Sequence, residues 1–240
     1  MTPRHKVDGQ PAFVLHAYPF SETSLIVEVF SRDFGRVPLL ARGARRPRSA
    51  MRGLLQGFQP LELGWAGKGE VKTLMKAEWQ GGQPLLTGKA LFCGYYLNEL
   101  LIHLLPREDA HERLFSIYTE TLRRFAEVLQ EADLRCFEKV LLQELGYGLM
   151  LEQDVSGAPI NAGENYFYEI ERGPVPLPNR SAGSSMLTVS GKTLFDLAHD
   201  VFSDPRSLLE AKQLMRMLIA HYTGGKELST RRIFMELQEL

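Results

Sequence analysis

The sequence has little cysteine. Cys93 and Cys136 are the two cysteines in 240 residues, and no Cys-x-x-Cys pair occurs. This excludes both a disulfide framework and a four-cysteine zinc site, so we expect two reduced, packed thiols and no cofactor.

Long apolar runs are also missing. The longest, such as residues 97–105, are interrupted by Asn98, Glu99 and His103, so no stretch of about 18 apolar residues could span a membrane. The basic N-terminus is followed by polar residues 8–10, where a signal peptide would need an apolar core. We therefore expect a cytoplasmic protein without a membrane partner.

Acidic residues are absent from one basic segment. The overall balance is nearly neutral, with 28 Lys and Arg against 29 Asp and Glu, but residues 1–82 carry a net charge of +5 and residues 83–240 a net charge of −6. Residues 36–52 contain six arginines and no acid. Such a block suits a polyanionic partner.

The hydrophobic period of the first third is that of short strands. In residues 25–30 and 61–65, apolar side chains alternate with other residues, as expected for strands with one buried face. We predict an α+β protein whose residues 1–82 form a five-stranded OB-fold β-barrel, because no helix of crossover length separates the strands. The predicted strands are 12–17, 25–30, 36–41, 60–65 and 71–79.

After a Gly-Gly-Gln-Pro segment at 81–84 the period becomes helical, which predicts an α-helical domain over residues 83–240. Residues 152–189 are rich in Gly, Pro and Asn and show no sustained period, so we expect an irregular or short-stranded insert there and helices from about Thr193. Three apolar stripes indicate helices: Leu114, Tyr118, Leu122, Phe125 and Leu129; Leu134, Phe137, Leu141, Leu142 and Leu145; and Leu208, Ala211, Met215, Leu218, Ile219 and Tyr222.

Motifs for catalysis are weak. The segments 190–193 (SGKT) and 224–226 (GGK) lack the first glycine of a phosphate-binding loop, so we interpret them as a helix start and a helix-ending turn. His103, Glu108 and His111, with Asp109 and Glu112, have metal-ligand chemistry, but Pro106 prevents a shared helix. A solvated turn between helices explains this cluster better than a metal site.

The arginine block is the strongest candidate site. It combines cations with small residues in what we expect to be a loop between strands, where arginines can follow phosphates without reading bases. Phe34, Phe58, Trp65 and Trp79 could stack on bases, although aromatic residues of a small barrel usually belong to its core. The predicted DNA-binding residues are Arg36, Arg42, Arg45, Arg46, Arg48, Arg52, Lys68 and Lys72.

An ordered set of segments resembles the bacterial RecO family of recombination mediator proteins. No single segment is decisive, but the set recurs in family order along nearly the whole chain. The segments are 12–16 (AFVLH) with 21–25 (SETSL), 34–37 (FGRV) with 41–45 (ARGAR), 67–74 (GKGEVKTL), 96–101 (YLNELL), 134–138 (LRCFE) with 145–148 (LGYG), and 224–226 (GGK) with 228–231 (LSTR).

The resemblance implies an OB-fold domain followed by a helical domain with a zinc-finger-like insert. It implies a non-enzymatic, nucleoid-associated protein that binds single- and double-stranded DNA and anneals complementary strands. It also implies that, with RecR, the protein helps load RecA onto DNA covered by single-strand-binding protein. Some similar proteins hold zinc through four cysteines in the insert, whereas residues 149–190 contain none, so we expect an insert without metal.

The resemblance also assigns a partner site to Arg135. In similar proteins the matching arginine helps grip the acidic, Phe-ending tail of single-strand-binding protein. The family pattern often has a second arginine next to it, where this chain has Cys136. From the residues alone, Arg135 would be a surface cation paired with Glu131 or Glu138.

Two other functions stay open. An RNA-binding OB-fold module would also explain the basic barrel. A metal-dependent nucleic-acid enzyme could be assembled in the helical half, around His103, Glu108 and His111.

Overall fold

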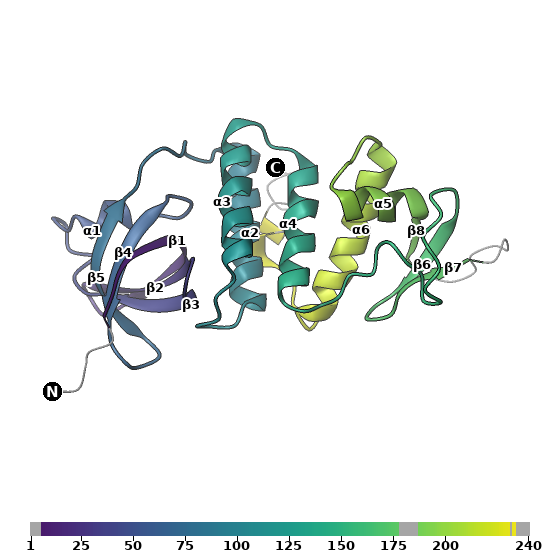
Figure 1. Cartoon of the computed structure of the whole chain (residues 1–240). Helices are drawn as coiled ribbons and strands as arrows, with labels where there is room; N and C mark the ends of the chain where they lie inside the picture. The colour runs from purple at the N-terminus through teal and green to yellow at the C-terminus, as the bar shows by residue number, and fades with distance from the viewer. Residues whose placement is uncertain (1–5, 178–186, 231, 234–240) are drawn as a thin grey trace. The chain divides into compact units, whose positions relative to one another are not determined.

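The first five strands form a closed barrel (Figure 1). The computed structural model describes residues 6–177, 187–230 and 232–233. The order around the barrel is β1-β2-β3-β5-β4, with β3 and β5 parallel and the other strand pairs antiparallel. The predicted OB-fold barrel is thus confirmed. Its elements are β1 (Lys6–Phe20), β2 (Ser24–Ser31), β3 (Gly35–Ala41), the short α1 (Met51–Leu54), β4 (Leu61–Ala66) and β5 (Lys72–Trp79).

Strand β1 is longer than predicted. It pairs with β4 through its first half and with β2 through its second half, with register shifts that bend it around the barrel. Pro11 and Pro19 lie inside it and interrupt the sequence pattern, which is why the prediction began at residue 12 and ended at residue 17. The other four strands match their predicted ranges to within one residue at each end.

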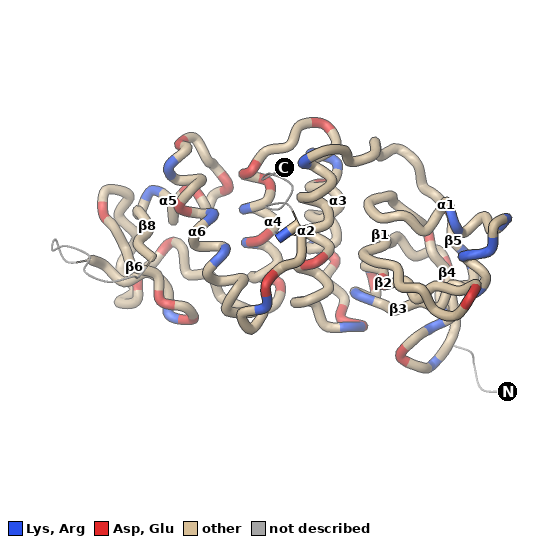
Figure 2. Tube along the Cα trace, turned by 180° about the vertical axis from the view of Figure 1, so that it is seen from behind, with Lys and Arg blue, Asp and Glu red and all other residues tan. Residues whose placement is uncertain are grey.

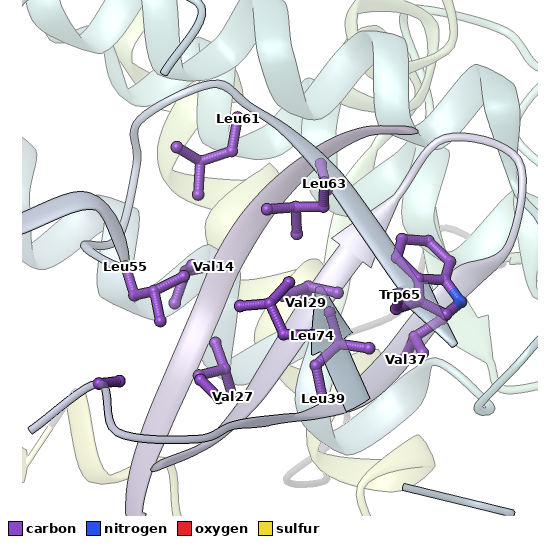
Figure 3. Packing of buried hydrophobic residues seen from close by; sticks show 13 residues of the cluster. Val14, Val27, Val29, Val37, Leu39, Leu55, Leu61, Leu63, Trp65 and Leu74 are labelled. Atoms are coloured by element: carbon purple, nitrogen blue, oxygen red, sulfur yellow. The ribbon is translucent and has the colours of Figure 1, made fainter. Parts of the chain in front are cut away.

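The barrel interior is filled by the alternating apolar side chains of its strands. Figure 3 shows them converging from all sides of the barrel, together with Leu55, which follows α1. Trp65 is part of this core and only 2% exposed. Removing this apolar surface from water is the main stabilising term for so small a barrel. The labelled side chains are Val14, Val27, Val29, Val37, Leu39, Leu55, Leu61, Leu63, Trp65 and Leu74.

Helices α2 (Gly88–Leu104) and α3 (Glu112–Glu127) belong to the same compact unit as the barrel. The buried Asn98 of α2 donates from Nδ2 to the carbonyl oxygen of Leu15 (2.9 Å) and accepts from the Tyr118 hydroxyl of α3 (2.5 Å). Phe13 of β1 packs edge-on against Tyr118, with ring centroids 5.2 Å apart. Polar and aromatic contacts thus fix both helices on the barrel.

This first unit comprises residues 1–129 and 228–240. Its late residues are attached through Glu99 of α2, whose carboxylate accepts from the backbone N–H groups of Ser229 (2.7 Å) and Thr230 (3.0 Å). The division predicted at residue 82 marks the change from strands to helices and falls inside this unit. As a domain boundary it stays a prediction.

The second compact unit comprises residues 130–227. The three predicted apolar stripes lie on α3, α4 and α6, apart from Leu129 and Leu145, which lie just beyond their helices. The described part of the insert contains a three-stranded sheet of order β7-β6-β8, whereas residues 178–186 lie outside the described chain. The unit's elements are α4 (Glu131–Glu144), β6 (Asn165–Glu169), β7 (Gly173–Pro176), β8 (Thr188–Ser190), α5 (Gly191–His199) and α6 (Pro205–Tyr222).

The two segments that resemble phosphate-binding loops are helix ends. Ser190 is the N-cap of α5 and accepts a hydrogen bond from the backbone N–H of Thr193 (3.2 Å). Gly224 and Gly225 follow the end of α6 with positive φ angles of 66° and 73°, as in a helix-ending turn. No helix in the described part of the chain is long and apolar enough to cross a membrane.

Candidate nucleic-acid interface

Residues 42–52, which we call the basic loop, follow β3 and include the first two residues of α1. Figure 2 shows its cations gathered at the edge of the barrel farthest from α2 and α3. Successive turns organise the loop: the backbone N–H of Arg46 donates to the Gly43 carbonyl (3.1 Å), and that of Ser49 donates to the Arg46 carbonyl (3.0 Å). Gly43 has φ +69°, which favours glycine. All five of its arginines are exposed: Arg42, Arg45, Arg46, Arg48 and Arg52.

Arg45 ties the basic loop to the turn between β1 and β2. Its guanidinium Nη1 donates to the Ser21 carbonyl (2.8 Å), and its backbone N–H donates to the Thr23 carbonyl (2.9 Å). In OB folds the turn between the first two strands flanks the usual oligonucleotide-binding face. The arginines are therefore displayed on an ordered loop beside that turn.

Arg36, by contrast, is engaged inside the fold. Its side chain is only 15% exposed, its Nε donates to the Leu105 carbonyl (3.0 Å), and its Nη1 lies 3.5 Å from the buried Glu28 carboxylate. Arg107 also pairs with Glu28. Burial lowers the pKa of Arg36 despite the attraction of Glu28. Arg36 thus contributes to a buried charge network, apart from the exposed arginines.

The two predicted lysines also differ. Lys68 lies exposed on the turn between β4 and β5. Lys72, at the start of β5, is only 13% exposed and forms an ion pair with Glu108. Burial lowers the pKa of Lys72. Lys68 is therefore the more accessible cation for a phosphate.

A cavity of about 440 Å³ opens beside these lysines. Val7 and Val37 line it together with Phe34 and Trp65, whose rings meet edge to face with centroids 5.4 Å apart. Phe34 is 38% exposed, whereas Trp65 is buried. The remaining lining residues are Gly67, Lys68, Lys72 and Glu108.

The other two candidate aromatics lie elsewhere. Phe58 is buried and packs edge-on against Tyr95 of α2, with ring centroids 5.0 Å apart. Trp79 is 57% exposed, and its Nε1 donates to Gln59 Oε1 (3.2 Å). Phe58 and Trp65 are thus core residues, while Phe34 and Trp79 expose ring surface.

Arg135 lies on α4 and is buried. Its Nη2 donates to Glu138 Oε1 (2.8 Å), and the residue is 6% exposed. Its Nε is buried and has no hydrogen-bond partner among the described residues. The alternative interpretation of Arg135 as a surface cation is wrong, because the residue is buried. Its predicted pairing with Glu138 is present. Glu131, the other predicted partner, has a carboxylate oxygen 3.4 Å from Nζ of Lys212 instead.

The residues with metal-ligand chemistry do not converge. His103 lies 3.8 Å from Glu99, His111 lies 3.4 Å from Asp109, and Glu108 pairs with Lys72. Across the described residues no group of three or more His, Cys, Asp or Glu side chains could hold a metal ion.

Asp154 organises the first turn of the insert through hydrogen bonds. One carboxylate oxygen accepts from the backbone N–H groups of Ser156 (2.8 Å) and Ala158 (3.0 Å) and from the Ser156 hydroxyl (2.6 Å). These hydrogen bonds lower the pKa of Asp154, with the Ser156 hydroxyl as the largest cause. The hydrogen bonds to the Asp154 carboxylate thus hold the backbone of this turn together.

Sequence reasoning missed Glu28, Arg107 and the valines of the cavity, and it considered Glu108 only as a metal ligand and not as the partner of Lys72. Glu28 gave one faint signal, since it is a lone acid in an otherwise apolar strand. The others are brought to their partners by pairings between distant segments, such as Arg107 with Glu28, and carry no local pattern.

Comparisons with known proteins agree along the chain. Residues 8–82 match the model of the recombination protein O N-terminal domain, and residues 85–232 match that of the C-terminal domain. The DNA repair protein RecO of Dechloromonas aromatica (strain RCB) is 66% identical, with both chains covered completely. That of Aromatoleum aromaticum is 54% identical with the same coverage, and that of Nitrosospira multiformis is 52% identical over 99% of this chain and 98% of its own. The chain belongs to the RecO family of DNA repair and recombination proteins.

Proposed function

We propose that this protein is a recombination mediator that binds single- and double-stranded DNA through the basic loop and anneals complementary strands. With RecR it helps load RecA onto DNA coated by single-strand-binding protein. The observation that carries the proposal is the display of five exposed arginines on one acid-free loop of an OB-fold barrel.

The charges support annealing. Two single strands repel each other through their phosphates, and neutralising those phosphates lowers the barrier to their pairing. Arginines on a loop contact phosphates of any sequence, so they suit a protein that must accept any pair of complementary strands. The net charge of −6 over residues 83–240 argues against a second extended phosphate track.

Recruitment to coated DNA is assigned to Arg135. Its buried Nε has no acceptor among the described residues, which leaves donor capacity for a carboxylate of the acidic tail of single-strand-binding protein. Because the guanidinium is buried, the tail has to displace neighbouring groups to reach it.

An RNA-binding module is the second candidate that the basic loop allows. Arginine contacts to phosphates do not distinguish RNA from DNA, since that distinction depends on contacts to the 2′-hydroxyl. A preference for RNA over DNA of equal length and sequence would replace our proposal by this one. The metal-dependent enzyme has less support, because its candidate ligands pair with other groups.

The test is annealing of complementary fluorescent oligonucleotides coated with single-strand-binding protein, without nucleotide. We expect wild-type protein to accelerate annealing and the variant R45A/R46A/R48A to lose most of the acceleration on both coated and bare DNA. Arg135→Ala should lose it on coated DNA only. The matched control R123A/R172A/R206A removes three exposed arginines outside the barrel and should anneal normally.

The outcomes separate the parts of the proposal. No annealing by wild-type protein would overturn annealing itself. If the control triple variant failed as badly as the loop variant, overall charge and not the basic loop would carry DNA binding. If Arg135→Ala also lost annealing on bare DNA, the proposal that Arg135 acts only through single-strand-binding protein would be contradicted.

A further inference from the structure

We propose that the cavity beside Phe34 holds one unstacked base of single-stranded DNA, so that the barrel grips a single strand by a base as well as by its phosphates. This inference rests on the proposed DNA binding and adds to it a site that distinguishes single from double strands. In a duplex the bases are paired and stacked, so a duplex cannot supply this base without being opened.

The walls of the cavity suit the faces of a flat ring. Phe34 presents an exposed ring, and Trp65, Val7 and Val37 provide an apolar floor. The edge of one aromatic ring against the face of the other holds Phe34 at a fixed orientation over Trp65, with an angle of 81° between the ring planes. The volume of about 440 Å³ lies within the range of small-molecule sites.

Gly67 keeps one wall free of side chain. Its φ of +140° is a conformation that other residues rarely adopt, and a Cβ there would point at Lys72, 3.5 Å from its Cα. The turn therefore depends on glycine, and the bare backbone leaves the space beside Lys72 open.

The polar rim favours a nucleotide over an apolar side chain of a protein. Lys68 is an exposed cation suited to the phosphate of the bound nucleotide. The Lys72–Glu108 pair places an ammonium and a carboxylate at the same rim, where base edges carry acceptors and donors. An apolar peptide side chain would displace water from Lys68 and from the Lys72–Glu108 pair without offering either a hydrogen bond.

Phe34 of the cavity and the basic loop lie at opposite ends of β3. Phe34 directly precedes β3, and Arg42, the first arginine of the loop, directly follows it. At about 3.3 Å per residue, these eight positions correspond to roughly 26 Å of extended chain. A short single strand can therefore reach both, with phosphates on the loop and a base in the cavity.

Trp65 provides a direct reporter. The chain has two tryptophans, so Trp79→Phe leaves Trp65, which lines the cavity, as the sole source of tryptophan fluorescence. In this background we would titrate a 12-nucleotide single strand of mixed sequence and an abasic strand of equal length and charge. The variants are Phe34→Leu, which removes the ring but keeps an apolar side chain, and the control Phe195→Leu, which removes an exposed ring from α5.

We expect the base-containing strand to quench Trp65 and to bind about tenfold more tightly than the abasic strand, the size of one lost stacking contact. Phe34→Leu should remove that tenfold difference without changing affinity for the abasic strand, and Phe195→Leu should change neither. Affinity for duplex DNA should be the same in all variants.

Four results would overturn the inference. Saturation with single-stranded DNA without a change in Trp65 fluorescence would show that the cavity stays empty, while the proposed DNA binding would stand. Equal loss of affinity for both strands in Phe34→Leu would mean a structural role for the ring. No DNA binding by the Trp79→Phe protein would overturn both proposals. Quenching of Trp65 fluorescence by an apolar peptide but not by DNA would assign the cavity to a protein partner.

Discussion

Asn98 is the buried polar residue that joins α2 to the barrel. It forms hydrogen bonds with two buried groups, the Leu15 carbonyl and the Tyr118 hydroxyl. Burial raises the pKa of Tyr118, so this hydroxyl stays a donor over the whole neutral range. The contact is specific because each partner offers complementary chemistry at hydrogen-bond distance.

We predict that Asn98→Ala lowers the free energy of unfolding by about 2–4 kcal/mol, because it leaves both groups buried without this partner. Urea denaturation followed by tryptophan fluorescence would measure this, since Trp65 and Trp79 both lie in the barrel. Tyr118→Phe, which removes one hydroxyl, should cost only about 1 kcal/mol. If Asn98→Ala changed stability by less than Tyr118→Phe, the amide would not be the link between helix and barrel.

The arginines show which properties of single residues can be predicted from the sequence. The absence of acid from residues 36–52 predicted a basic segment, and the structure displays five of its arginines on one loop. The sequence pattern could not distinguish the buried Arg36 from the exposed arginines. The Leu105 carbonyl that Arg36 contacts lies 69 positions away, and Glu28 is brought close to Arg36 only by the pairing of β2 with β3. The burial of Arg135 was also not predictable, because a charged residue on a helix is usually exposed and its burial depends on contacts with distant segments.

Secondary structure was more predictable than the site because it depends on local periodicity. The alternation in β4 and the apolar stripe of α3 each follow from one buried face, whereas β2 is buried on both faces over residues 27–31. The cavity was not predictable, since its lining comes from β1, the β2–β3 turn, β3, β4, β5 and the α2–α3 connection. A short stretch of sequence does not indicate which of these distant segments lie together in the fold.

The attachment of Ser229 and Thr230 to α2 should depend on pH. Burial alone would raise the pKa of Glu99, but the hydrogen bonds from Thr230 and Ser229 outweigh it and hold that pKa below its ordinary value. A carboxylate with a lowered pKa in the folded state stabilises the fold above its ordinary pKa of about 4.3. That contribution is lost as the pH falls through the lowered value.

We therefore predict that hydrogen-exchange protection of the Ser229 and Thr230 amides falls as the pH drops below about 4.3, after correction for intrinsic rates. Glu99→Gln should lower their protection at neutral pH by about tenfold, the worth of a hydrogen bond to a charged group, and remove the pH dependence. Protection that stayed constant in acid, or that Glu99→Gln left unchanged, would show that other contacts hold these residues.

For the molecule as a whole, the division of charge predicts the salt dependence of DNA binding. If about five cations of the basic loop neutralise phosphates of a single strand, the logarithm of the association constant should fall with that of salt concentration at a slope near −3.5. The variant R45A/R46A/R48A should flatten the slope by about 2, because three contacts are gone. Fluorescence anisotropy across a salt series would measure both slopes, and a wild-type slope near zero would rule out binding through phosphates.

The chain leaves its first compact unit after residue 129 and returns to it at residue 228. During synthesis, therefore, the barrel and helices α2 and α3 emerge from the ribosome long before Ser229 and Thr230, the residues that Glu99 holds. The whole second unit is made in the interval, and domains generally fold as they emerge. Glu99 is therefore synthesised 130 residues before its partner Ser229, so the first compact unit is the first to begin folding and the last to be completed.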